Sequence, residues 1–289
     1  MIELKQSAGE KVFSVFNYIL LAAIALLTLY PFVYVLSASI SSADAVIRGK
    51  VILLPSDITF ESYAKVLAEK GIWIAYANTI FYTVFGVAAN LLFTVSGAYA
   101  LSKKRLMGRT AISFFIALTM WFQAGMIPTY LNLRDLSLLD NRFTIIIAFA
   151  ITTFYVFLMR TFFQSIPEEL EEAAKVDGAS DLQVLRMVYL PLSKAALATI
   201  GLFYAVLRWN GYFWAMIILK DENKVPLQVL LKKLIVEMNI MDEMGDMTVY
   251  SKETVIYATI VVSIIPIIAV YPFIQKYFVK GVMVGSIKG

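Results

Sequence analysis

Long stretches without a charged residue dominate this sequence of 289 residues. Between Lys11 and Asp44 there are 32 uncharged residues, and between Lys70 and Lys103 there are another 32. A helix needs about 20 apolar residues to cross a hydrocarbon layer about 30 Å thick. Hydrophobic residues make up 60% of the chain and charged residues only 16%, against about 25% charged in soluble domains. A soluble fold of this size cannot hide so much apolar surface, so the sequence predicts a membrane protein.

Six apolar stretches predict an all-α polytopic membrane protein with six transmembrane helices. We expect the spans near residues 16–38, 75–101, 110–131, 143–163, 195–219 and 254–275. They form one transmembrane domain over 16–275, preceded by an N-terminal segment, 1–15, and followed by a C-terminal tail, 276–289. The apolar run of the first span, from Tyr18 to Leu36, is longer than the roughly 7–15 residues of a signal peptide core. We therefore interpret it as a span.

The charges of one short loop predict the topology. An even number of spans places both termini on the same side of the membrane. The connection after the second predicted span carries four cations, Lys103, Lys104, Arg105 and Arg109. Short loops rich in Lys and Arg stay in the cytoplasm, so we expect both termini to be cytoplasmic and the loops near 39–74 and 220–253 to lie outside.

The second outer loop holds apolar residues at helical spacing, which predicts an amphipathic helix on the outer membrane face or on the bundle. These residues are Leu227, Leu230, Leu231, Leu234, Ile235 and Met238. An acidic, Met-rich stretch follows over 242–247. We interpret it as a solvated loop, with contact to a partner as the alternative.

The composition excludes several classes of chemistry. The chain has no Cys and no His, which excludes disulfides, thiolate chemistry, Cys/His metal sites and imidazole catalysis. A net charge of +4 suggests no nucleic-acid partner. The phosphate-binding pattern G-x-x-x-x-G-K-[ST] is missing as well, because Gly49-Lys50 is followed by Val51. We expect a non-catalytic chain that itself binds no cofactor and no metal.

The predicted cytoplasmic loop between the fourth and fifth spans, 164–192, reads as two capped helices. Ser165 with Glu168 forms the pattern of a capping box, and Pro167 suits a first helical turn. Gly178 suits the left-handed position that ends a helix. Ser180 with Gln183 repeats the capping box. Four carboxylates occupy the start of the first helix, where the helix dipole favours negative charge: Glu168, Glu169, Glu171 and Glu172. We expect Pro191 to end the second helix.

The spacing within this loop resembles a family signature. Glu172-Ala173-Ala174, then three residues, Gly178, nine residues and Val188-Tyr189-Leu190-Pro191 is similar to the E-A-A-x3-G-x9-I-x-L-P signature of permease subunits in binding-protein-dependent ABC importers. Val188 stands where the signature has Ile. A surface hairpin that merely connects two spans is the alternative interpretation, and it does not require this spacing.

The resemblance covers nearly the whole chain and points to the carbohydrate branch that includes the smaller maltose permease subunit. The segments that carry it are 61–67, 77–79, 96–101, 126–128, 209–210 and 281–289. Segments 211–216 and 226–230 are most similar to permeases of polysaccharide-fragment importers, including uronate and alginate types. Family members often have Asn-Ser where this chain has Asn78-Thr79, and Asp where it has Gly211.

This resemblance implies a type I ABC importer permease fold in the cytoplasmic (inner) membrane of a bacterium. It implies oligosaccharide uptake by a pair of permeases, the second being a different chain. It also implies two ATPase subunits that bind ATP and Mg, an extracytoplasmic solute-binding protein that delivers the substrate, and a cytoplasmic coupling helix between helices 4 and 5. The residues implied at the ATPase contact or bracing it are Glu172, Ala173, Ala174, Asp177, Gly178, Leu190 and Pro191.

A third set of residues suggests a substrate path. Arg208 is the single charge inside the fifth predicted span, and an ionisable residue in a span is a candidate functional site. We interpret it as part of a polar, aromatic wall for sugars. Snorkelling outward, or pairing with an acid of a sister subunit, is the alternative. The candidate path residues are Asn78, Tyr82, Gln123, Tyr204, Arg208, Trp209, Asn210 and Tyr212.

The second span carries a stripe of small and weakly polar residues that favours helix packing over pore lining. The stripe comprises Thr79, Thr83, Gly86, Asn90, Thr94 and Gly97. Among functions, a secondary transporter is the first alternative, but no predicted span holds Asp or Glu. A permease for a solute other than a sugar is another, and an intramembrane enzyme lacks a supporting set of residues.

Overall fold

A computed structural model describes residues 8–243 and 253–269 of this chain. Within these residues the regular elements are helices, apart from one isolated antiparallel bridge between Ser41 and Ile58. The chain divides into two compact units, one of Met1–Lys70 with Leu231–Ile265 and one of Gly71–Leu230 with Pro266–Gly289. The predicted tail, 276–289, and the end of the sixth predicted span lie outside the described residues, as does most of the acidic stretch after residue 243.

The first unit is built on one long helix, α1 (Ala8–Ser39), whose apolar side chains are exposed over most of its length. Short helices α2 (Ala43–Ile47) and α3 (Glu61–Ala68) follow. Ala38, Ala45 and Val46 form a small core, and Tyr34 meets Tyr257 edge to face at 5.8 Å between ring centres. Tyr257 belongs to an apolar helix over Glu253–Ala269.

The second unit is organised around α4 (Lys70–Ser102), a helix of 33 residues. One face of α4 is buried and carries most of the stripe noted in the sequence, including Gly86, Asn90 and Thr94. Thr94 Oγ1 lies 2.7 Å from the Tyr204 hydroxyl of α12 (Lys194–Asn210). The stripe therefore packs against a neighbouring helix, as the sequence interpretation expected.

Three of the predicted spans each contain a break in the helix in the structure. The third consists of α5 (Arg109–Trp121) and α6 (Met126–Asp135), bent by 114°. The fourth consists of α7 (Arg142–Ile147) and α8 (Thr153–Gln164). The fifth consists of α12 and α13 (Phe213–Ile218). The first break has a local cause, because Gly125 takes the left-handed φ of +81° before α6.

Among the described residues, length and composition single out two helices, α1 and α4, that could each cross a membrane. If each of two bent helix pairs counts as one span, the number rises to as many as four. The second of these pairs joins Asp181–Leu192 to α12 across a bend of 84°. The expected amphipathic helix of the second outer loop is present as α14 (Leu227–Glu243), which follows the short helix η2 (Glu222–Lys224).

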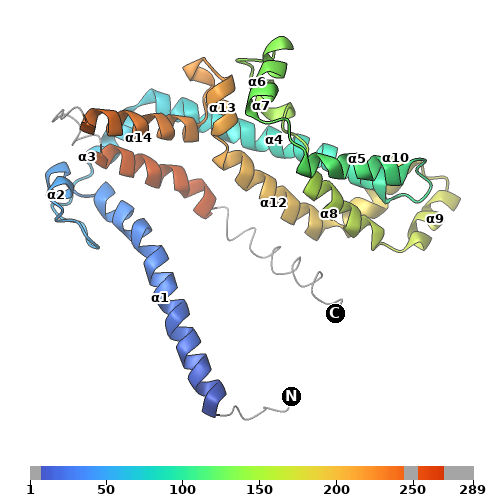
Figure 1. The fold of residues 1–289 in the computed structure, drawn as a ribbon, viewed down its shortest axis with the longest axis horizontal. Helices are drawn as coiled ribbons and strands as arrows, with labels where there is room; N and C mark the ends of the chain where they lie inside the picture. The colour runs from blue at the N-terminus through green and yellow to red at the C-terminus, as the bar shows by residue number, and fades with distance from the viewer. Residues whose placement is uncertain (1–7, 244–252, 270–289) are drawn as a thin grey trace. The chain divides into compact units, whose positions relative to one another are not determined.

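The loop between α8 and α12 folds as a helical hairpin against the second unit. It contains α9 (Glu168–Val176), α10 (Asp181–Val184), the π-helix η1 (Leu185–Tyr189) and α11 (Leu190–Leu192). In Figure 1 this hairpin lies at the C-terminal end of α8 and the N-terminal end of α12. Val184 and Tyr189 of the hairpin enter one hydrophobic core with Leu101 of α4, Phe163 of α8 and Ile200 of α12. The hairpin is thus packed against the helices and is not a free loop.

Candidate functional site

The first helix of the hairpin, α9, begins with acidic residues. Glu168, Glu169 and Glu171 lie in its first turn, where the positive end of the helix dipole favours them. The expected capping box of Ser165 is wrong. Pro167 occupies the cap position, and Ser165 Oγ donates to the carbonyl of Phe162 at 2.7 Å, because Ser165 ends α8 instead.

The turn between the two helices of the hairpin follows the sequence prediction. Gly178 has a φ of +83°, a conformation that costs glycine little and other residues more. The amide of Ala179 donates to the carbonyl of Ala174 at 2.9 Å, which closes the end of α9. The capping box of Ser180 and Gln183 is confirmed at the start of α10. The helical run ends at Leu192, one residue beyond Pro191.

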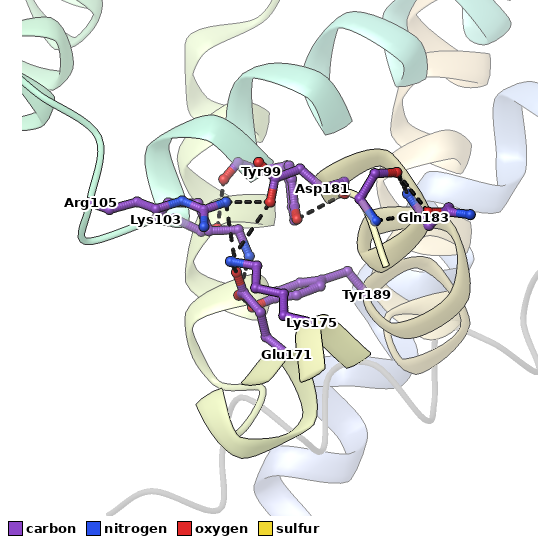
Figure 2. A network of polar contacts seen from close by, with 10 residues as sticks. Tyr99, Lys103, Arg105, Glu171, Lys175, Asp181, Gln183 and Tyr189 are labelled. Atoms are coloured by element: carbon purple, nitrogen blue, oxygen red, sulfur yellow. Dashed lines mark hydrogen bonds and ion pairs between the residues drawn. The ribbon is translucent and has the colours of Figure 1, made fainter. Parts of the chain in front are cut away.

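Glu171 is the centre of a network of polar contacts, shown in Figure 2. One carboxylate oxygen accepts from Lys103 Nζ at 2.5 Å and from the Tyr189 hydroxyl at 2.8 Å. The other accepts from Lys175 Nζ at 2.6 Å, and Arg105 lies 4.0 Å away. The Glu171 side chain is only 13% exposed. The network therefore joins the α4–α5 connection to both helical parts of the hairpin.

Lys103 is more deeply enclosed than its partner. The residue is 8% exposed, and its ammonium lies 4.0 Å from the ring centre of Tyr99 and 3.8 Å from that of Tyr189. A cation against two aromatic faces is stabilised by their quadrupoles. Around it, Arg105 pairs with Asp181, and the Tyr99 hydroxyl donates to the backbone carbonyl of Asp181 at 3.0 Å.

The electrostatics of the network keep Glu171 ionised. Burial by itself raises the pKa of this carboxyl, but hydrogen bonds from Lys103, Lys175 and Tyr189 outweigh it and lower the pKa to about 2. Burial lowers the pKa of Lys103, and its bond to Glu171 opposes that effect. Burial and then the bond to Glu171 raise the pKa of the Tyr189 hydroxyl. The ionised forms of Glu171 and Lys103 therefore stabilise each other.

Two open pockets border α9. One, of about 470 Å³, is lined by Lys103, Lys104 and Arg105 on one side and by Glu168 and Glu172 on the other, among further residues. The second, of about 310 Å³, lies inside the hairpin between α9 and η1. Its lining comprises Ala174, Asp177, Gly178, Ala179, Gln183, Val184 and Met187.

The seven residues expected at an ATPase contact divide by exposure. Five are exposed and two are partly buried against the core. The exposed ones are Glu172, Ala173, Asp177, Gly178 and Pro191; the partly buried ones are Ala174 and Leu190. Apolar neighbours are also open to solvent, with Val176 87% exposed, Leu182 74% and Met187 71%. Apolar side chains exposed around a packed hairpin suit contact with another protein.

Two of the candidate path residues, Asn78 and Tyr82, form hydrogen bonds to the backbone of residues 223–225, at η2. Asn78 Nδ2 donates to the carbonyls of Asn223 and Val225 at 2.8 and 3.0 Å, and the Tyr82 hydroxyl donates to that of Lys224 at 2.8 Å. Asp140 reinforces the segment, since its Oδ2 accepts from Lys224 Nζ at 2.7 Å. These two α4 residues therefore satisfy backbone carbonyls.

Arg208 also satisfies carbonyls. Its guanidinium donates to the backbone oxygens of Ile145, Ile146 and Phe149, the last two at 2.9 and 3.1 Å, and to Asn90 Oδ1 at 2.6 Å. These carbonyls end α7 or lie in the break before α8. A helix end leaves carbonyls without intrahelical partners and carries partial negative charge. Arg208 therefore caps the break within the fourth predicted span.

The other candidate path residues lie in different environments. Tyr204 is fully buried, and Trp209 is 8% exposed beside Tyr76. Asn210 donates to the carbonyl of Val206 on its own helix at 2.9 Å and is exposed, as are Gln123 and Tyr212. Their part in a substrate path stays a prediction.

The residues that sequence reasoning missed are the buried members of the network, namely Glu171, Lys103 and Tyr189. The signal was available in the charges. The four cations of 103–109 indicate topology, and the four carboxylates of 168–172 suit the start of a helix, but each of these patterns is local. Two short segments of opposite charge that the predicted topology places on one side of the membrane can be expected to pair.

The chain is similar to known transport proteins over nearly its full length. Residues 70–284 match the family described as the binding-protein-dependent transport system inner membrane component. The polygalacturonan/rhamnogalacturonan transport system permease protein YtcP of Bacillus subtilis (strain 168) is 39% identical, over 97% of this chain and 99% of that protein. Protein LplC of the same organism is 37% identical over 96% of each chain.

A solved structure carries the same fold. It is a crystal structure of a bacterial ABC transporter involved in the import of the acidic polysaccharide alginate, and one of its chains is 56% identical with a TM-score of 0.89, covering 95% of this chain and 99% of that one. The fold and the sequence match agree. The chain is a member of the family of inner membrane components of binding-protein-dependent transport systems.

Proposed function

We propose that this chain is a permease subunit of an ABC importer that takes up fragments of acidic polysaccharides. The observation that carries the substrate class is the similarity to two proteins, one assigned to polygalacturonan and rhamnogalacturonan and one to alginate. All three polymers contain uronic acids. A second candidate class is neutral oligosaccharides, favoured by relatives such as the lactose permease protein LacG of Rhizobium radiobacter, 27% identical over 94% of this chain.

In this proposal the chain spans the cytoplasmic membrane of a bacterium six times, within residues 16–275, with the tail 276–289 and both termini in the cytoplasm. The broken helices are compatible with this topology, because irregular backbone within a membrane is tolerated where protein groups satisfy it. Arg208 and Asn78 supply such groups.

The helix α9 is the proposed coupling helix, on which a partner ATPase acts. Glu172, Ala173, Asp177 and Gly178 present an exposed surface, and small residues let a partner backbone approach closely. Leu190 and Pro191 brace the second half of the hairpin. A helix fixed to its neighbours by ion pairs, as α9 is through Glu171, transmits a displacement, whereas a flexible loop absorbs it. ATP and Mg are bound by the ATPase subunits in this scheme and not by this chain.

The remaining partners follow from the family. An extracytoplasmic binding protein delivers the substrate, and a second permease completes the path. We propose Gln123, Trp209, Asn210 and Tyr212 as sugar-contacting candidates, whereas Tyr204 is fully buried. For Arg208 the capping contacts favour a role in holding the helix break over direct contact with substrate.

Reconstitution tests this function. The chain is purified with its second permease and ATPase in proteoliposomes, and ATP hydrolysis is measured with binding protein loaded with oligomers of mannuronate, galacturonate or neutral glucose. We expect stimulation by the uronate oligomers. Stimulation by neutral oligomers alone contradicts the substrate class, and uptake by the purified chain without an ATPase contradicts the importer.

A further inference from the structure

The Glu171 network joins two elements that are far apart in the sequence. Lys103 follows directly on the last residue of α4, and Glu171 lies in the first turn of α9. Their charged atoms are 2.5 Å apart, and both side chains are largely buried, at 9% and 13% exposure. The Tyr189 hydroxyl and the rings of Tyr99 and Tyr189 enclose the pair.

On its N-terminal side α9 follows α8 after three residues, but on its C-terminal side the backbone route from α9 to α12 is less direct. It passes a glycine turn at Gly178, the π-helix η1 and a bend of 84° before α12. Turns, π-helices and bends are the places where helical structure deforms most easily. The contact between Glu171 and Lys103 bypasses all three and leads from α9 straight to the end of α4.

We propose that Glu171 and Lys103 form a mechanical link through which α9 moves the cytoplasmic end of α4 during transport, with Glu171 as a positioning residue. This inference rests on the proposed function, because it takes α9 as the helix that a partner ATPase displaces. It adds a second route for that displacement, which leads into the helix that carries Asn78 and Tyr82.

A neighbouring ion pair provides a matched control. Lys104 pairs with Glu168 at 2.7 Å and joins the same connection to the same helix, but its side chains are 76% and 62% exposed. Exposed pairs contribute little because water screens them and both side chains lose freedom. Only the buried pair is also held by further hydrogen bonds and by two aromatic rings, so only it transmits motion in this proposal.

The first experiment compares Glu171→Gln with Glu168→Gln in the full transporter. Measured quantities are the yield of assembled complex, the basal ATPase rate and the rate stimulated by loaded binding protein. We expect Glu171→Gln to lower the stimulated rate about tenfold relative to the basal rate, and Glu168→Gln to change it less than about twofold. Equal stimulation ratios for wild type and Glu171→Gln in assembled complexes overturn the proposal.

The second experiment separates coupling from folding. The chain has no Cys, so Lys103→Cys with Glu171→Cys creates a unique thiol pair, studied with cysteine-free partners. Transport and ATP hydrolysis are measured on one preparation before and after a short bis-maleimide joins the two thiols. We expect poor stimulation before joining and recovery of at least about fivefold afterwards. No recovery in cross-linked, assembled complex overturns the link.

The same measurements distinguish the two proposals. If wild-type complex shows no stimulation by any loaded binding protein, the proposed function fails, and the link between Glu171 and Lys103, which rests on that function, fails with it. If wild type is stimulated and both Glu171 tests give wild-type ratios, the importer stands and the link alone fails.

Discussion

Two polar clusters in the second unit solve the burial of a cation in different ways. At the hairpin between α8 and α12, Lys103 meets a carboxylate, Glu171, which has two further donors. Among the described contacts of Arg208 inside the fifth predicted span there is no acid, only three backbone carbonyls and the amide oxygen of Asn90. The first cluster balances charge with charge, and the second balances it with dipoles.

The difference follows from what each region can supply. Outside the membrane, acidic residues are inexpensive and can be placed in the first turn of α9. Inside a span they are costly, and a broken helix already offers unpaired carbonyls. An isolated charge within a span therefore does not by itself indicate a substrate contact. It can indicate that a helix is broken nearby.

Loss of Glu171 should have the largest effect on stability. Glu171→Gln leaves Lys103 enclosed without its counter-charge, and breaking a buried pair costs about 3–5 kcal/mol. Lys103→Met should cost less, because Glu171 keeps Lys175 and Tyr189. Thermal unfolding of the purified complex in detergent measures both. Equal midpoints for the two variants would show that the pair is not asymmetric.

Arg208→Lys should be the next most harmful change. Lysine keeps the charge but lacks the planar fork that reaches several acceptors at once, so at least one carbonyl at the end of α7 loses its partner. An unsatisfied buried acceptor costs about 1–3 kcal/mol. The thermal midpoint of assembled complex reports the loss. Uptake that falls while the midpoint is unchanged would instead support direct contact between Arg208 and the substrate.

Gly86→Ala tests how closely the Arg208 cluster is packed. A Cβ at position 86 would lie 2.8 Å from Arg208 Nε, whereas at Gly97, on the same helix, the nearest atom would be 3.6 Å away. Overpacking costs about 1–3 kcal/mol, so we expect Gly86→Ala to destabilise the protein and Gly97→Ala to leave it nearly unchanged. Similar midpoints for the two variants would mean that Arg208 can move aside.

Acidification should have the smallest effect over the accessible range. The folded pKa of Glu171, about 2, is below its usual value. Its stabilising contribution is therefore complete above about pH 5 and is lost as the pH falls toward 2. Between pH 7 and pH 4 we expect a loss of about 1 kcal/mol or less, absent in Glu171→Gln. A Glu171-dependent loss above pH 5 would contradict the geometry.

The sequence predicted the elements that depend on local chemistry. Gly178 with its left-handed turn, the capping box of Ser180 and α14 were all predictable, because each follows from neighbours within a few residues. The breaks near Phe149 and Gly211 were not, since hydropathy averages over a whole span and does not register a helix end. At the break near Phe149, the free carbonyls are satisfied by Arg208, about 60 residues away in the chain.

The ion pair between Lys103 and Glu171 is not among the sequence predictions, although both charged segments are visible in the sequence. Each segment was explained by a local rule, topology for one and the helix dipole for the other, and neither rule looks across 68 positions of sequence. The Ser165 cap failed for the opposite reason. A correct local pattern was present, but α8 extended far enough to use the serine at its own end.

The length of α4 has a consequence for leverage. About 1.5 Å of rise per residue places Lys103 roughly 37 Å from Asn78 along a single unbroken rod. Near the middle, Gly86 sits against a guanidinium that is fastened to another helix. If that contact acts as a fulcrum, a tilt of about 5° moves Lys103 by roughly 2 Å and Asn78 by about 1 Å the other way. Because the arm from Gly86 to Lys103 is about twice as long as the arm from Gly86 to Asn78, the position that meets Glu171 moves farther than the position of Asn78.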